Sequence, residues 1–125
     1  MRILLIDDEI NFIDNLLLYL EDRGHTVDFL TWVKDNDHLR EHLDRVQPDG
    51  VILDFGMEPQ GDQLYRWIHI WNQTTRIVFY TSYARSPEKL QLMEAVGQEL
   101  HTEVRIVHKQ EVGSDVHTLL HALRS

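Results

Sequence analysis

The sequence predicts an α/β protein in which five parallel strands alternate with five helices. Short apolar runs rich in β-branched or aromatic residues recur at residues 3–6, 27–30, 51–53, 77–80 and 104–107. Such runs fit the pleated, buried surface of a sheet. A longer stretch with apolar residues at helical spacing follows each run. This alternation is typical of a doubly wound (βα)5 sheet with helices on both faces.

The strand runs differ in how completely they are apolar. Three of the five are almost continuously apolar, as expected for parallel strands that are covered on both faces. The second run alternates, because Thr26 and Asp28 stand between apolar neighbours. We therefore expect this run to form an edge of the sheet.

The helical stretches carry apolar stripes and recognisable ends. The stripes are Ile10, Ile13, Leu17 and Leu20; Leu39, Leu43 and Val46; Leu64, Ile68 and Trp71; Leu90, Met93 and Val96; and Val116, Leu119 or Leu120, and Leu123. Gly24 suits the left-handed residue after the first helix. Ser86 and Pro87 predict the start of the fourth helix, with serine as the cap. Pro48 to Gly50 is expected to close the second helix.

Composition limits the classes of protein that fit. The 125 residues suit one domain, 1–125, and 42% hydrophobic with 26% charged residues is ordinary for a globule. There is no cysteine, which excludes thiolate sites. The net charge of −9, with arginines scattered along the chain, argues against direct nucleic acid binding. No apolar run approaches the roughly 20 residues that span a membrane, and the short N-terminus resembles no signal peptide, so we expect a cytoplasmic domain.

Charged and hydroxyl residues follow four of the predicted strands. Asp7 and Asp8 follow the first, Asp54 the third, Thr81 the fourth and Lys109 the fifth. Ligands of open parallel sheets bind beyond the carboxyl ends of the strands. Converging carboxylates share protons or hold a cation, and an all-oxygen set favours Mg²⁺. Together with a lysine and a hydroxyl, these are the parts needed to move a phosphoryl group onto an aspartate.

These motifs resemble the receiver domain of two-component response regulators over essentially the whole chain. The matching segments are residues 3–9, 51–54, 77–82 and 107–109. The resemblance implies a flavodoxin-like sheet with strand order 2-1-3-4-5. It also implies that Asp54 is the phosphoacceptor and that Lys109 and Thr81 contact the phosphoryl oxygens. The implied Mg²⁺ ligands are Asp8 and Asp54 directly, Asp7 mainly through water, and the Gly56 carbonyl.

Simpler interpretations exist for several of these residues. Asp7 and Asp8 could only cap the first helix, and Ser82 could take the role of Thr81 after a one-residue shift of register. The pairs His38/His42 and His117/His121 have the spacing of zinc ligands but no third ligand in sight. Trp67 and Trp71 are interpreted as packing or interface residues.

The chain also departs from the family pattern near the predicted site. Glu58 stands where the family usually has proline, and Pro59 follows it, so the loop beside the acceptor is expected to be rebuilt. Gln110 replaces the proline that usually follows the lysine, which argues against a cis Lys109–Gln110 bond. Ile106 replaces the family's switch aromatic. Tyr83, two residues after Thr81, is expected to cover the approach of water to Asp54.

Three functions are consistent with these features. The first is a phosphoacceptor receiver that takes its phosphoryl group from a histidine kinase or phosphotransfer protein and then switches contacts with an unknown output partner. Such a protein would catalyse only its own phosphotransfer and dephosphorylation, and would not be a turnover enzyme. The second is a pseudo-receiver that docks partners without phosphorylation. The third is a Mg²⁺-dependent phosphatase or nucleotide-binding enzyme; against it, no glycine-rich phosphate loop follows Ile6, and Gly56 stands where a general acid would be needed.

Overall fold

The computed structural model describes residues 1–109 and 112–124, with the side chains of residues 10, 12 and 112–115 left out. The strands are β1 (Arg2–Ile6), β2 (Thr26–Leu30), β3 (Gly50–Leu53), β4 (Arg76–Thr81) and β5 (Arg105–His108). The helices are α1 (Ile10–Asp22), α2 (Asn36–Val46), α3 (Gly61–Trp71), α4 (Pro87–Leu100) and α5 (Val112–Arg124). The predicted alternation of five strands and five helices is confirmed.

All strand pairs are parallel, and the sheet order is β2-β1-β3-β4-β5. This order confirms the flavodoxin-like topology and places the alternating strand β2 at an edge. The last strand begins one residue later than its apolar run suggests, at Arg105.

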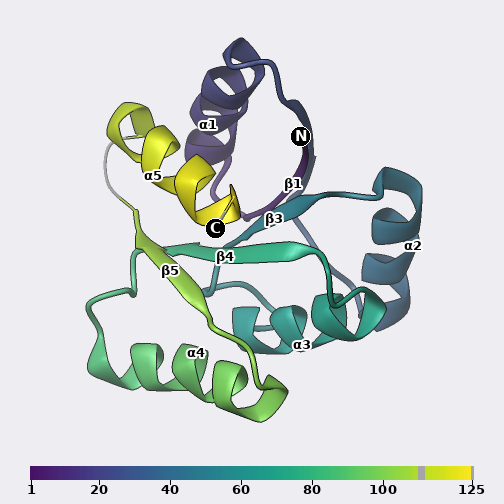
Figure 1. Cartoon of the computed structure of the whole chain (residues 1–125), viewed down its shortest axis with the longest axis vertical. Helices are drawn as coiled ribbons and strands as arrows, with labels where there is room; N and C mark the ends of the chain where they lie inside the picture. The colour runs from purple at the N-terminus through teal and green to yellow at the C-terminus, as the bar shows by residue number, and fades with distance from the viewer. Residues whose placement is uncertain (110–111, 125) are drawn as a thin grey trace.

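Helices cover both faces of the sheet (Figure 1): α1 and α5 lie on one face, and α2, α3 and α4 on the other. Each face has its own apolar core, and the sheet contributes alternate residues to the two. Among the described side chains of α1, the buried stripe consists of Ile13, Leu16 and Leu20. Leu17 of the predicted stripe is only half-buried, because it lies on the opposite side of Ile13 from Leu16 and Leu20, at the edge of this stripe.

Local signals set the helix ends. The Ser86 hydroxyl accepts a hydrogen bond from the amide of Lys89 at 3.5 Å, and Pro87 is the first residue of α4, as predicted. Gly24 has a φ of +86°, which confirms its left-handed conformation after α1. The helix α2 ends at Val46, and Gln47 takes the left-handed position before Pro48, which agrees with the predicted end of this helix.

The start of α3 packs directly on the backbone at the end of β3. A Cβ atom on Gly61 would stand 2.5 Å from the Cα of Phe55 and 2.8 Å from the carbonyl oxygen of Asp54. The Gly61 amide donates to the Phe55 carbonyl at 2.9 Å. Only glycine allows this close approach, which fixes the backbone that carries Asp54.

Among the described residues, no helix is both long enough and apolar enough to cross a lipid bilayer.

Candidate functional site

The candidate site is built at the carboxyl end of the sheet by continuing the strand ladder one residue beyond each strand. The backbone amides of Asp7, Asp54 and Lys109 each donate to a carbonyl of the neighbouring strand, at 3.1, 2.9 and 2.9 Å. Three residues that are distant in sequence are therefore held at one edge with fixed backbones. The predicted positions of these three residues, directly after the ends of their strands, are confirmed.

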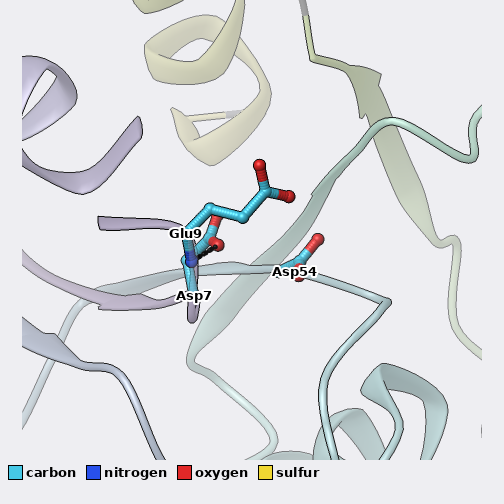
Figure 2. Close-up of side chains that lie close together, drawn as sticks. All are labelled: Asp7, Glu9 and Asp54. Atoms are coloured by element: carbon cyan, nitrogen blue, oxygen red, sulfur yellow. Dashed lines mark hydrogen bonds between the residues drawn. The ribbon is translucent and has the colours of Figure 1, made fainter. Parts of the chain in front are cut away.

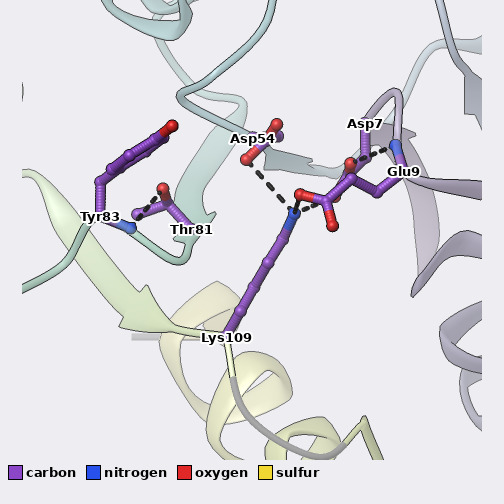
Figure 3. Close-up of polar contacts among 6 residues, drawn as sticks. All are labelled: Asp7, Glu9, Asp54, Thr81, Tyr83 and Lys109. Carbon is purple, nitrogen blue, oxygen red and sulfur yellow. Dashed lines mark hydrogen bonds and ion pairs between the residues drawn. The ribbon is translucent and has the colours of Figure 1, made fainter. Parts of the chain in front are cut away.

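Lys109 is the centre of the polar contacts (Figure 3). Its Nζ lies 2.8 Å from Asp7 Oδ2, 3.3 Å from Asp54 Oδ1 and 3.2 Å from Glu9 Oε1. The lysine side chain is only 1% exposed, and that of Asp54 only 5%, whereas the Glu9 side chain is 48% exposed. A buried ammonium group thus bridges two buried carboxylates and one at the rim.

Burial and charge perturb the titration of these groups. Burial is the main cause that raises the pKa of Asp54 to about 6; Lys109 opposes the shift, and the charges of Asp7 and Asp8 add to it. Burial likewise raises the pKa of Asp7 against the pull of Lys109. Burial alone would lower the pKa of Lys109, but the surrounding carboxylates outweigh it and raise that pKa. Such perturbed pKa values in one cluster are typical of functional sites.

The carboxylates form a candidate cation site (Figure 2). One oxygen from each of Asp7, Glu9 and Asp54 lies within 4.8 Å of the others. Asp7 is held in place because its Oδ1 accepts a hydrogen bond from the Glu9 amide at 2.9 Å. When all three are ionised, their charge exceeds that of Lys109 by two, which one divalent cation neutralises. An all-oxygen donor set of this charge fits Mg²⁺.

Glu9 is the one cluster member that the sequence interpretation did not assign. It is also the N-cap residue of α1, yet its side chain makes no capping hydrogen bond and turns to Lys109 instead. Asp8 lies outside the cluster and is exposed. Its carboxylate makes no hydrogen bond or ion pair with another described residue, but its charge helps to raise the pKa of Asp54.

The loop after β3 brings Gly56 next to Asp54. A Cβ atom on Gly56 would stand 3.8 Å from Asp54 Oδ2 and 3.0 Å from Cε2 of Tyr83. Glu58 is exposed and precedes Pro59 through a cis peptide bond. Among the described residues, Glu58 does not join the oxygen cluster of Asp7, Glu9 and Asp54.

Thr81 and Tyr83 close the side of the site opposite Glu9 (Figure 3). Thr81 is fully buried, and its Oγ1 accepts a hydrogen bond from the Tyr83 amide at 3.1 Å, so the hydroxyl proton is left to donate. Tyr83 is 42% exposed, and its ring packs edge-on against Phe55 beneath the ammonium group of Lys89. Ser82, the alternative to Thr81, is exposed.

The predicted switch position lies on the α3–α4 face of the sheet. Ile106 is partly buried there against the apolar core. Near it in sequence, the Nδ1 atom of His108 is buried without a hydrogen-bond partner among the described residues. The Lys109–Gln110 bond lies outside the described residues.

The remaining candidate residues lie away from this cluster. The rings of His38 and His42 contact each other edge-on at 5.1 Å, and the Nδ1 of His38 accepts from the Lys34 amide. Trp67 and Trp71 pack against the apolar core, which confirms the packing interpretation.

Comparisons with known proteins bear on the family and the fold. The family model of the response regulator receiver domain matches residues 3–101 of the chain. No curated protein sequence matches the chain at a significant level.

Three solved structures illustrate the similarity of fold. Chemotaxis protein CheY4 of Vibrio cholerae is 21% identical, with a TM-score of 0.73 and 96% of each chain covered. TrrA of Thermotoga maritima, in complex with Mg²⁺-BeF, is 22% identical, with a TM-score of 0.70 and coverage of 98% of this chain and 97% of that one. A Burkholderia pseudomallei response regulator with a phosphorylated aspartic acid and a calcium ion is 20% identical, with a TM-score of 0.73 and coverage of 97% and 65%.

Proposed function

The chain belongs to the response regulator receiver domain family, and from that membership we propose that Asp54 accepts a phosphoryl group from a phosphohistidine. The observation that carries the proposal is the buried contact between Asp54 and Lys109 at the carboxyl end of the sheet. The phosphorylated aspartic acid of the similar Burkholderia pseudomallei protein supports the same chemistry.

In the proposed transfer, an oxygen of Asp54 attacks the phosphorus while the bond from phosphorus to the donor imidazole nitrogen breaks. The attacking carboxylate must be ionised, and with a pKa of about 6 roughly nine-tenths of Asp54 is ionised at pH 7. The Lys109 ammonium group then pairs with a phosphoryl oxygen in place of the carboxylate, and the Thr81 hydroxyl donates a hydrogen bond to another phosphoryl oxygen. Partial desolvation thus leaves Asp54 reactive without keeping it protonated.

We assign a Mg²⁺ site to the oxygens of Asp7, Asp8 and Asp54 and the Gly56 carbonyl. When bound, the ion offsets the negative charge of the carboxylates and of the transferring phosphoryl group. The oxygens of Asp7 and Asp54, which lie within 4.8 Å of each other, support this assignment. Asp8 and the Gly56 carbonyl are included because membership of the receiver family implies them, and the Asp8 carboxylate makes no hydrogen bond or ion pair with another described residue. The Mg²⁺-BeF complex of the similar TrrA supports the choice of ion.

The donor in this proposal is a histidine kinase or a phosphotransfer protein. The chain supplies the acceptor, the cation site and the charge-stabilising groups, so its own catalysis is limited to gaining and losing one phosphoryl group. A change in the contacts with an output partner would follow from the phosphorylated state.

Intact mass after incubation with phosphoramidate and Mg²⁺ tests the proposal. The wild type should gain one phosphoryl group, and Asp54→Asn should gain none. Asp14→Asn removes an exposed carboxylate on α1 and is the matched control, which should be phosphorylated like the wild type.

A pseudo-receiver that docks partners without phosphorylation is the second candidate. The observations that favour it are Ile106 at the switch position and a Lys109 already held by three carboxylates. If the wild type gains no mass under these conditions, the pseudo-receiver is the better interpretation. Release of many phosphates per protein molecule would indicate a phosphatase instead.

A further inference from the structure

A cavity lined mainly by basic side chains lies between the C-terminal parts of α1 and α5, at the end of the sheet opposite Asp54. We call it the α1–α5 basic pocket, and its volume is about 310 Å³. It is lined by Arg23, His25, His117, Leu120, His121 and Arg124. None of these lining residues is acidic, although the whole chain has 21 acidic against 12 basic residues.

His25 forms the buried wall of this pocket. The residue is 9% exposed, and its Nδ1 accepts a hydrogen bond from the N-terminal amine of Met1 at 2.9 Å. The neutral ring therefore carries its proton on Nε2, which is a donor. Burial lowers the pKa of His25 first, and the charges of the Met1 amine, Arg124 and Arg23 lower it further. All three cations are thus close enough to act on the His25 ring.

Stabilisation of helix ends accounts for only part of this charge. Arg23 donates one guanidinium hydrogen bond to the Tyr19 carbonyl at 3.1 Å, in the last turns of α1. Each helix C-terminus carries roughly half a negative charge, which is less than the charge of the two guanidinium groups that line the pocket. The guanidinium of Arg124 makes no hydrogen bond or ion pair with any other residue that the structure describes.

We propose that the α1–α5 basic pocket binds a compact phosphate-type dianion, either inorganic phosphate or a phosphomonoester. Two guanidinium groups at the ends of α1 and α5 offer the paired donors that match phosphate oxygens, and the imidazole of His25 adds a donor from the wall. The volume lies at the lower end of the range for small-ligand pockets.

A transition metal is the competing ligand, because His117 and His121 are four residues apart and the fold brings His25 into the same pocket. In the described part of the chain, however, only Asp7, Glu9 and Asp54 bring three ligand atoms within 4.8 Å of one another. The guanidinium groups of Arg23 and Arg124 would also repel a cation. The charges favour an anion.

The experiment follows backbone amide NMR shifts while inorganic phosphate is added at constant ionic strength, without divalent cations. All variants in this experiment also carry Asp54→Asn, which removes the proposed phosphoacceptor. The result therefore does not depend on whether Asp54 can be phosphorylated. Saturable shifts should appear at residues 23–26 and 117–124. Arg23→Gln and Arg124→Gln should each weaken phosphate at least tenfold, whereas Arg40→Gln, an exposed arginine on α2, should leave the affinity unchanged. The amide spectrum of each variant also shows whether it is folded.

Phosphate should bind more tightly than acetate. The proposal is overturned by shifts that do not saturate, by an equal loss of affinity in Arg40→Gln, or by acetate binding as tightly as phosphate. A parallel titration uses Zn²⁺ in place of phosphate. If Zn²⁺ saturates the same residues, and both arginine variants bind it as tightly as the protein without them, the pocket is a metal site and the proposal is overturned. Binding of a phosphomonoester more tightly than inorganic phosphate would identify the source of the dianion within the proposal.

Discussion

Replacement of the phosphoacceptor, Asp54→Asn, should stabilise the folded protein at neutral pH. The Asp54 side chain is 5% exposed, and burial raises its pKa from 3.8 to about 6. In the unfolded chain the carboxyl group ionises near its ordinary pKa, so between these two values the folded protein holds a proton that the unfolded chain has lost. The contribution of Asp54 to stability is therefore highest below about pH 4, falls as the pH rises to about 6, and stays lowered above that.

The magnitude follows from the size of the pKa shift. A shift of about two units corresponds to about 3 kcal/mol at pH 7, because each unit is about 1.4 kcal/mol. The pKa includes the attraction of Lys109, so this figure is the net cost of an ionised Asp54. Asparagine carries no charge at any of these pH values, and Asp54→Asn should recover about 1–3 kcal/mol at pH 7 and close to none at pH 4.

Urea unfolding of both proteins at pH 4, 5.5 and 7, followed by tryptophan fluorescence without Mg²⁺, measures this difference. Asp14→Asn is the control, because it removes an exposed carboxylate and should change the free energy of unfolding by less than about 0.5 kcal/mol. A variant that is equally stable or less stable than the wild type at pH 7, or a gain that does not depend on pH, would refute the reasoning.

Four further outcomes are expected. Asp8→Asn should weaken Mg²⁺ binding, followed by intrinsic fluorescence, far more than Glu9→Gln, because the proposed set of direct ligands includes Asp8 and not Glu9; equal losses would exclude Asp8 as a direct ligand. Tyr83→Ala should shorten the lifetime of the phosphorylated protein, measured by loss of the added mass, because the ring stands beside Gly56 next to Asp54; an unchanged or longer lifetime counts against this. Gly61→Ala should lower the free energy of unfolding by about 1–3 kcal/mol, because its Cβ would meet backbone atoms at 2.5 and 2.8 Å; a neutral result would show that α3 can move away. Hydrogen exchange with and without beryllofluoride should change most in residues 57–62 and little in α4, β5 and α5, since the β-branched Ile106 has one favoured rotamer; the reverse pattern would restore a distal switch.

Much of this architecture was predictable because neighbouring residues control it. The five apolar runs became the five strands, the alternating run became the edge strand β2, and Ser86 capped α4. The carboxyl-end position of Asp7, Asp54 and Lys109 followed as well, since the end of a parallel strand is set by where its apolar run stops. Each of these features depends on backbone preference or on the side-chain period of a single element.

The contacts across the molecule needed the packing of the elements. No local pattern distinguishes Asp8 from Glu9 as the partner of Lys109, because the choice depends on how the chain turns between β1 and α1 and on the reach of the longer side chain. His25 and the pair His117/His121 are far apart in sequence, and they share a pocket only because α1 and α5 cover the same face of the sheet. Sequence spacing fixes which residues share a face of one helix or strand. Which faces meet, and at what distance, depends on how side chains from different elements fill the space between them.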